Sequence, residues 1–190
     1  GGFDTLQEGG DDPPVPATVH RSPAVRPDAL DPRSWCSVLD LPPESGPGSL
    51  VWRAAGDCST LDGMRETVQA VETAPAHRRA ARNHLDLADS WGVFDAAGLS
   101  ATDLTGPEAT VLDLSGLDSG PMNAVARGVA ETLYRTRVEQ ATERLPWLLV
   151  DETHAFFDGI AGPALRRILT RGRAPYRKSP SRNLTSSSPT

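Results

Sequence analysis

The chain has 190 residues, enough for one sizeable hydrophobic core, and it has no apolar run near the ~18 residues that a membrane span requires. Acidic residues outnumber basic ones by 25 to 19, and Lys178 is the single lysine, which argues against a broad basic surface that wraps nucleic acid. With no secretion signal in the sequence, we expect a cytoplasmic chain in which Cys36 and Cys58 are reduced thiols.

The first half of the chain is predicted to be a flexible arm followed by a helical segment. Residues 1–34 are rich in Gly, Pro and Asp and have no sustained apolar period, which is typical of a loose arm. Residues 35–104 are predicted to form a mostly helical insert. There, Leu61 and Val68 share a helical face after a Ser/Thr cap, and Pro75 opens another helix.

Residues 105–175 alternate between strand and helix patterns. A strand is predicted over 109–114, and Pro121 begins a long helix. The run 147–152 is predicted to be the next strand, and because its first four residues are all apolar, it resembles a central parallel strand buried on both faces.

A last helix is predicted to begin at Pro163 and to end at Gly172. Strand, helix, strand and helix joined by short connections indicate a parallel sheet covered by helices, so the expected fold class is α/β.

Two adjacent carboxylates, Asp151 and Glu152, end the apolar run 147–150. Ligands of open α/β sheets bind beyond the carboxyl ends of the strands, where both side chains would project. Four apolar residues followed by Asp-Glu form the Walker B pattern, in which the Asp holds Mg²⁺ partly through water and the Glu orients the attacking water. The alternative is an ordinary strand whose acids cap the following turn.

Three other polar residues lie near this pattern. His154 is expected to be hydrogen-bonded within the turn that follows the carboxylates. Asp113 and Ser115, after the first strand, are expected to have structural roles, although both would lie near the same edge of the sheet.

Three segments together resemble a known family: "ATVLDLSGLDSGPMNAVARGVAETLY", "LPWLLVDETHAFFDG" and "ALRRILTRGRAP". They are similar to the ATPase core of HerA/FtsK-like ring motors, in particular archaeal HerA-type ATPases, over roughly residues 105–175. The Asp-rich, nearly lysine-free composition likewise resembles that of proteins from salt-loving archaea. The resemblance implies a RecA-like P-loop core, with ATP and Mg²⁺ as cofactors, and a homo-hexamer that translocates double-stranded DNA.

The same resemblance implies residue roles. Asp151 matches the Mg²⁺-coordinating acid, and Glu152 matches the acid that activates water. Arg173 matches an arginine that reaches the nucleotide of a neighbouring subunit, with a charged helix-end turn as its alternative. His154 matches a residue that couples nucleotide state to partner contacts.

A P-loop enzyme also needs G-x-x-x-x-G-K-[ST] to hold the phosphates, and this sequence contains no Gly-Lys pair. We therefore expect a Walker B-containing portion of such an ATPase that is inactive alone. One alternative is a non-catalytic pseudo-ATPase module that docks on intact subunits through a sheet edge. Another is a DExH-box superfamily-two helicase fragment, although that family also needs Walker A and a downstream Ser-Ala-Thr segment.

Residues 176–190 have no apolar run and carry three basic residues but no acid, which predicts a disordered tail. Plausible GC-rich codons for 178–190, read two bases later, encode a continuation similar to that of the family. Because these codons were chosen to test the idea, out-of-frame translation of the tail is a hypothesis, with a basic DNA-contacting tail as the alternative.

Overall fold

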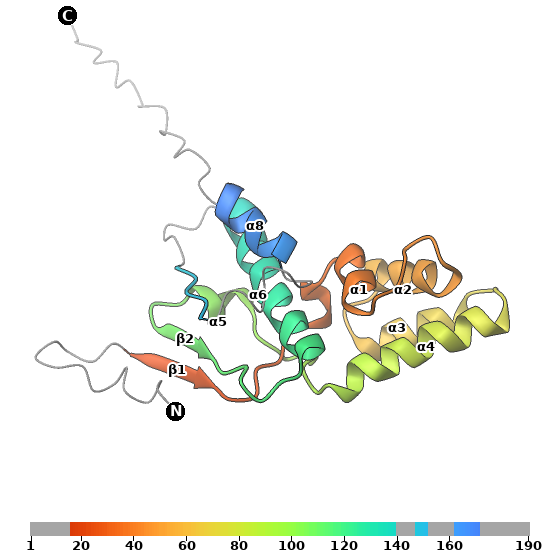
Figure 1. The fold of residues 1–190 in the computed structure, drawn as a ribbon, viewed down its shortest axis with the longest axis horizontal. Helices are drawn as coiled ribbons and strands as arrows, with labels where there is room; N and C mark the ends of the chain where they lie inside the picture. Colours follow the sequence, from red (N-terminus) through yellow and green to blue (C-terminus); the bar gives the residue numbers. More distant parts are fainter. Residues whose placement is uncertain (1–15, 140–146, 152–161, 172–190) are drawn as a thin grey trace, which may run out of the picture.

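The computed structural model describes residues 16–139, 147–151 and 162–171. A two-stranded sheet lies beside helices α5 and α6, α8 packs on α6, and helices α1 to α4 extend to the other side of the molecule (Figure 1). The elements in chain order are β1 (Ala17–His20), the 3-10 helix η2 (Pro27–Ala29), α1 (Pro32–Val38), α2 (Gly46–Asp57), α3 (Leu61–Ala70), α4 (Pro75–Ser90), α5 (Ala101–Thr105), β2 (Ala109–Leu112), α6 (Ser119–Glu139) and α8 (Gly162–Arg171).

The two strands are parallel, and the partner of β2 is β1. Their register pairs Ala17 with Ala109 and His20 with Leu112. Parallel strands need a long crossover connection. Here the connection between β1 and β2 contains the five helices from α1 to α5. The structure therefore confirms a mixed α/β fold with parallel strands, whereas the RecA-like core remains a prediction.

Helices α3 and α4 begin where the sequence predicts, whereas the starts of α1 and α2 were not predicted. The side chains of Asp31, Ser45 and Thr60 accept hydrogen bonds from backbone amides of the first turns of α1, α2 and α3. Pro75 is the first residue of α4, where its missing amide hydrogen has no cost. Leu61, Met64 and Val68 of α3 are buried, as the helical spacing predicts.

The prediction that residues 1–34 form a loose arm is wrong for its described part, residues 16–34. This part contains β1, η2 and the start of α1, and the side chains of Val25 and Leu30 are each 1% exposed. Here Pro and Asp do not mark disorder: Asp31 caps α1, and Pro32 is its first residue. Backbone hydrogen bonds to residues 93–99, distant in sequence, hold the segment in place.

The helices of the second half agree with the sequence, but the second predicted strand does not. Helix α6 begins at Ser119, two residues before Pro121, and α8 begins one residue before Pro163. The prediction of a buried strand over 147–152 is wrong for 147–151, which form no strand; Trp147 is 91% and Leu149 89% exposed. An apolar run predicts burial, but a strand also needs a pairing partner, which local sequence does not specify.

The core is continuous from the insert to α6. The centroid of the Trp35 ring in α1 lies 4.6 Å from that of Phe94, with the two rings tilted by 31°, and the Phe94 ring also lies 6.4 Å from that of Trp91. This aromatic cluster belongs to the same buried cluster as Val125 and Val129 of α6. In the described part of the chain, no helix is both long and apolar enough to cross a membrane.

Candidate functional site

The site residues predicted from the sequence are only partly described by the structure. Asp151 is an exposed turn residue. Glu152, His154 and Arg173 lie outside the described residues, so the structure leaves their predicted roles untested.

The residue before Asp151 is anchored between two helices. Val150 is half-buried against a small cluster formed by Ala130 of α6 with Ala164 and Leu165 of α8. Leu114, two residues after β2, packs against this cluster and also against the main core. Within residues 147–151, Val150 is therefore the residue that packs against the cluster between α6 and α8.

Asp113 and Ser115 form a local turn at the carboxyl end of β2. The Asp113 amide donates to the His20 carbonyl at 2.9 Å, which ends the pairing with β1. The Ser115 hydroxyl and amide donate to Asp113 Oδ1 at 2.7 and 3.1 Å. Both hydrogen bonds lower the pKa of Asp113 below its ordinary value, and the bond from the Ser115 hydroxyl has the larger effect. The structural role expected for this pair is consistent with this geometry.

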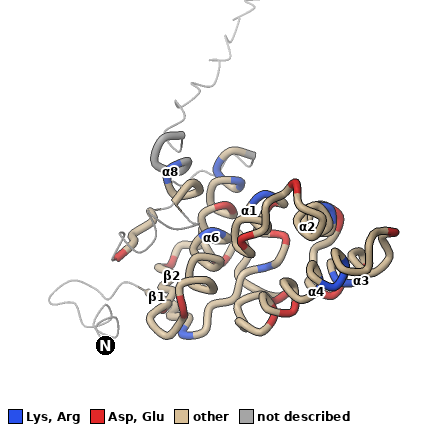
Figure 2. The backbone as a smooth tube through the Cα atoms, turned by 45° about the vertical axis from the view of Figure 1, so that its right-hand side comes forward, with Lys and Arg blue, Asp and Glu red and all other residues tan. Residues whose placement is uncertain are grey.

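Charges of both signs are mixed over the helices of the insert (Figure 2). Arg65 of α3 illustrates this, because its guanidinium bonds three carboxylates, those of Asp62, Asp86 and Asp89, at 2.7–2.8 Å. Over the residues that the structure places, no group of three or more His, Cys, Asp or Glu side chains has the arrangement of a metal site.

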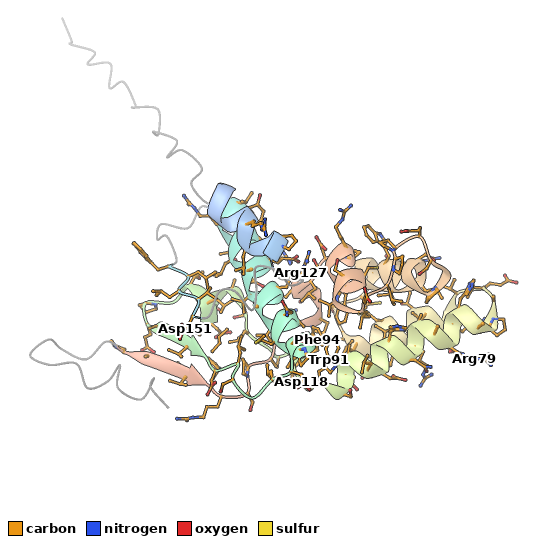
Figure 3. All side chains as sticks on the ribbon, in the orientation of Figure 1. Arg79, Trp91, Phe94, Asp118, Arg127 and Asp151 are labelled. Atoms are coloured by element: carbon orange, nitrogen blue, oxygen red, sulfur yellow. The ribbon has the colours of Figure 1, made fainter. Side chains whose placement is uncertain are left out.

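Asp151 and the insert occupy different parts of the molecule. In Figure 3, Asp151 lies on the side of β2, whereas Arg79 of α4 lies toward the opposite end. The buried Arg127 of α6 lies between them in this view.

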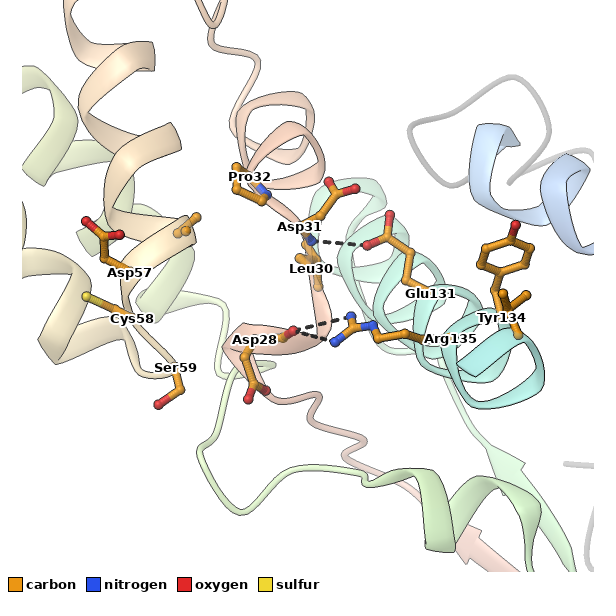
Figure 4. Close-up of a pocket in the computed structure, with 13 residues that line it drawn as sticks. Asp28, Leu30, Asp31, Pro32, Asp57, Cys58, Ser59, Glu131, Tyr134 and Arg135 are labelled. Atoms are coloured by element: carbon orange, nitrogen blue, oxygen red, sulfur yellow. Dashed lines mark hydrogen bonds between the residues drawn. The ribbon is translucent and has the colours of Figure 1, made fainter. Parts of the chain in front are cut away.

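A cavity of ≈ 600 Å³ lies between α6 and the end of α2. Figure 4 shows Asp57, Cys58 and Ser59 on one side of it and Glu131, Tyr134 and Arg135 on the other. Its full lining is Asp28, Leu30, Asp31, Pro32, Ala55, Gly56, Asp57, Cys58, Ser59, Glu131, Tyr134, Arg135 and Val138.

Ion pairs and hydrogen bonds engage the charged groups around the cavity. Glu131 accepts from Arg127 at 2.9 Å, and both side chains are almost fully buried. Arg26 binds Asp28 through two hydrogen bonds of 3.0 and 2.9 Å. Arg135 donates to the backbone carbonyl of Ala29 at 2.7 Å. The charged residues that line the cavity therefore mainly hold α6 against η2 and the start of α1.

The sequence reasoning missed this network, although one signal for it was present. Arg127, Glu131 and Arg135 recur at four-residue spacing, which aligns them on one face of a helix. That spacing predicts an ion pair within α6, but it does not reveal the distant backbone that the same face binds.

No protein-family model matches the chain, and no curated protein matches it significantly.

Proposed function

We propose that the chain is the Walker B-containing portion of a HerA/FtsK-like ATPase, of the kind that translocates DNA. The observation that carries the proposal is the motif "LPWLLVDE" with its two flanking helices, α6 and α8. Support comes from Val150, which packs against both helices just before Asp151. A parallel strand pair that precedes α6 is also consistent with this class.

In an intact ATPase of this class, Asp151 would hold Mg²⁺ through water, and Glu152 would polarise the attacking water. Arg173 reaches the nucleotide of a neighbouring subunit in a homo-hexamer, and double-stranded DNA is the partner. The exposed position of Asp151 is compatible with a metal contact made through water.

The residues present do not fit a complete site for Mg²⁺ and ATP. A P-loop lysine and its glycine-rich turn carry much of the phosphate binding, and the sequence has no Gly-Lys pair. We therefore propose that these 190 residues alone do not hydrolyse ATP.

The test is an ATPase assay on the purified chain with Mg²⁺, beside the Glu152→Gln variant. We expect both proteins to release phosphate at the rate of the buffer blank. Mg²⁺-dependent turnover that Glu152→Gln abolishes would contradict inactivity. The DNA that precedes the codons of these 190 residues is expected to encode G-x-x-x-x-G-K-[ST], and the absence of this motif there would count against the family.

A second candidate is a non-catalytic module that docks on intact ATPase subunits. The exposed apolar side chains of Trp147 and Leu149 favour it, because contiguous exposed apolar residues mark interaction sites. Co-purification with an intact HerA-type subunit, lost in Trp147→Ser/Leu149→Ser, is the expected result. Co-purification that persists in that variant would count against this surface.

A further inference from the structure

Strand β1 and the segment that follows it are attached to the molecule in very different ways. Among the described residues, β1 is held by a four-residue ladder to β2 and by a long hydrogen bond of 3.5 Å from the Thr18 hydroxyl to the Glu108 carboxylate, and none of its residues is fully buried. Two hydrogen bonds of 2.9 Å flank the ladder, one from the Ala109 amide to the Pro16 carbonyl and one from the amide of Asp113, the residue after β2, to the His20 carbonyl. A two-stranded sheet is marginal in water without further packing.

Residues 24–31, in contrast, are anchored on two sides. On the first side, the amide of Val25 donates to the Val93 carbonyl at 2.9 Å, and the amide of Leu99 donates to the Ala24 carbonyl at 2.8 Å. The Val25 side chain is 1% exposed.

Helix α6 forms the second side of this anchor. Arg135 donates to the carbonyls of Asp28 and Ala29, and the Glu131 carboxylate accepts from the Asp31 amide at 3.2 Å. Gly128 lies so close to the segment that a Cβ there would come within 3.0 Å of the Val25 side chain.

The change from weak to strong attachment occurs within three residues. Arg21 and Ser22, directly after β1, are exposed and form a bend, and Pro23 is buried. Local opening free energies in a protein range from near zero to that of global unfolding, and they are lowest where buried contacts are few.

We propose that β1 is a detachable strand that opens as a unit about residues 21–23, while residues 24–31 stay fixed on α6 and on residues 93–99. Opening leaves the amides and carbonyls of β2 that face β1 without their strand partner. The opening of β1 is independent of the ATPase proposal, because none of the residues that pair with β1 or anchor residues 24–31 belongs to the segment 147–152.

Residue-resolved amide hydrogen exchange on the full chain tests the proposal. The Ala109 and Asp113 amides report the β1–β2 ladder, and the Val25 and Leu99 amides report the anchored segment. We expect exchange of the first pair to be at least about 100-fold faster than that of the second. Equal protection of the two pairs would overturn the proposal.

A disulfide between the strands provides the second measurement. Ala17 and Ala109 are register partners, and adjacent strands lie ~4.8 Å apart, within the Cα range of a disulfide. Ala17→Cys/Ala109→Cys is made in a Cys58→Ser background, with Ala17→Cys alone as the control. On oxidation, hydrogen exchange of the Asp113 amide is expected to slow at least about tenfold in the double-cysteine variant. In the Ala17→Cys control, the exchange rate of this amide is expected to stay unchanged. Fast exchange that persists with the disulfide formed would also overturn the proposal.

Discussion

The hydroxyl of Ser34 donates a hydrogen bond of 2.5 Å to the Glu131 carboxylate, joining residues 97 positions apart in the chain. Ser34 is fully buried in the first turn of α1, and Glu131 lies in the middle of α6. The same carboxylate accepts from the Arg127 guanidinium and from the Asp31 amide. One buried side chain therefore connects the start of the helical insert to the helix that follows β2.

Glu131→Ala is expected to lower the free energy of unfolding by about 3–5 kcal/mol, because it removes the carboxylate of a buried ion pair and leaves the buried Arg127 charge behind. Urea denaturation, followed by circular dichroism, measures the loss.

The matched control replaces both partners with apolar residues. Arg127→Met/Glu131→Leu is expected to cost less than Glu131→Ala, since no charge then remains buried. A double variant that is less stable than the single one would contradict this account of the pair.

The elements that the sequence predicted correctly are those whose signals are local. Helices α3 and α4 are predicted by Thr60, by Pro75 and by apolar residues at helical spacing, all within one segment. The burial of Val25 was missed because it depends on residues 93–99 and on α6, which no local pattern connects to it. Pro and Asp near it predicted disorder, but they serve as helix starts and caps.

The candidate site shows the same division. The apolar run before Asp151 is visible in the sequence, but the pairing of a strand is not local, and β2 pairs with β1 instead. Of the run, Val150 alone is predicted correctly to be covered, and its partners come from α6 and α8. The cavity residues of α6 were missed because their backbone partners in residues 28–31 lie about a hundred residues away.

Two glycines in α2 should respond to alanine with opposite signs. A Cβ on Gly48 would overlap the backbone carbonyl of Pro42, so Gly48→Ala is expected to cost at least about 1–3 kcal/mol. A Cβ on Gly56 meets only Pro32 Cγ, at 3.8 Å, so Gly56→Ala is expected to add up to about 1 kcal/mol through helix propensity. Thermal unfolding of the two variants measures both effects, and a stabilised Gly48→Ala would contradict the packing of α2.

Arg65 of α3 should contribute stability that depends on salt. Arg65→Gln removes the cation among three carboxylates, and we expect a loss of about 1 kcal/mol at low ionic strength. The Asp partners are exposed, so the loss should shrink in 1 M NaCl, where the screening length is about 3 Å. Arg53→Gln is the control, since its 3.7 Å pair with Asp57 is solvent-exposed on both sides. Equal losses at low and high salt would contradict an electrostatic role for Arg65.

Asp28 should give the chain part of its sensitivity to acid. Hydrogen bonds from Arg26 are the main cause that lowers the pKa of Asp28 below its ordinary value. Because the folded pKa is depressed, this contribution to stability is complete above the unfolded pKa of about 3.9 and is lost as the pH falls through the folded pKa. In Arg26→Gln, the pKa of Asp28 is expected to rise, as measured by NMR titration of the carboxyl. The decline in stability between pH 5 and pH 3 should then be shallower than in the wild type, and an unchanged pKa would contradict this assignment.

Leu149 and Val150 distinguish the observed segment from the buried strand that the sequence predicted. Leu149 is 89% exposed, so Leu149→Ser is expected to change the free energy of unfolding by no more than about 0.5 kcal/mol. Val150 packs against Ala130, Ala164 and Leu165, so Val150→Ala is expected to cost about 1–2 kcal/mol. In a strand buried on both faces, both substitutions would be costly, because neighbouring side chains would each enter a core. Urea denaturation of the two variants therefore decides the matter: a loss above about 2 kcal/mol for Leu149→Ser would place residues 147–150 in a buried sheet.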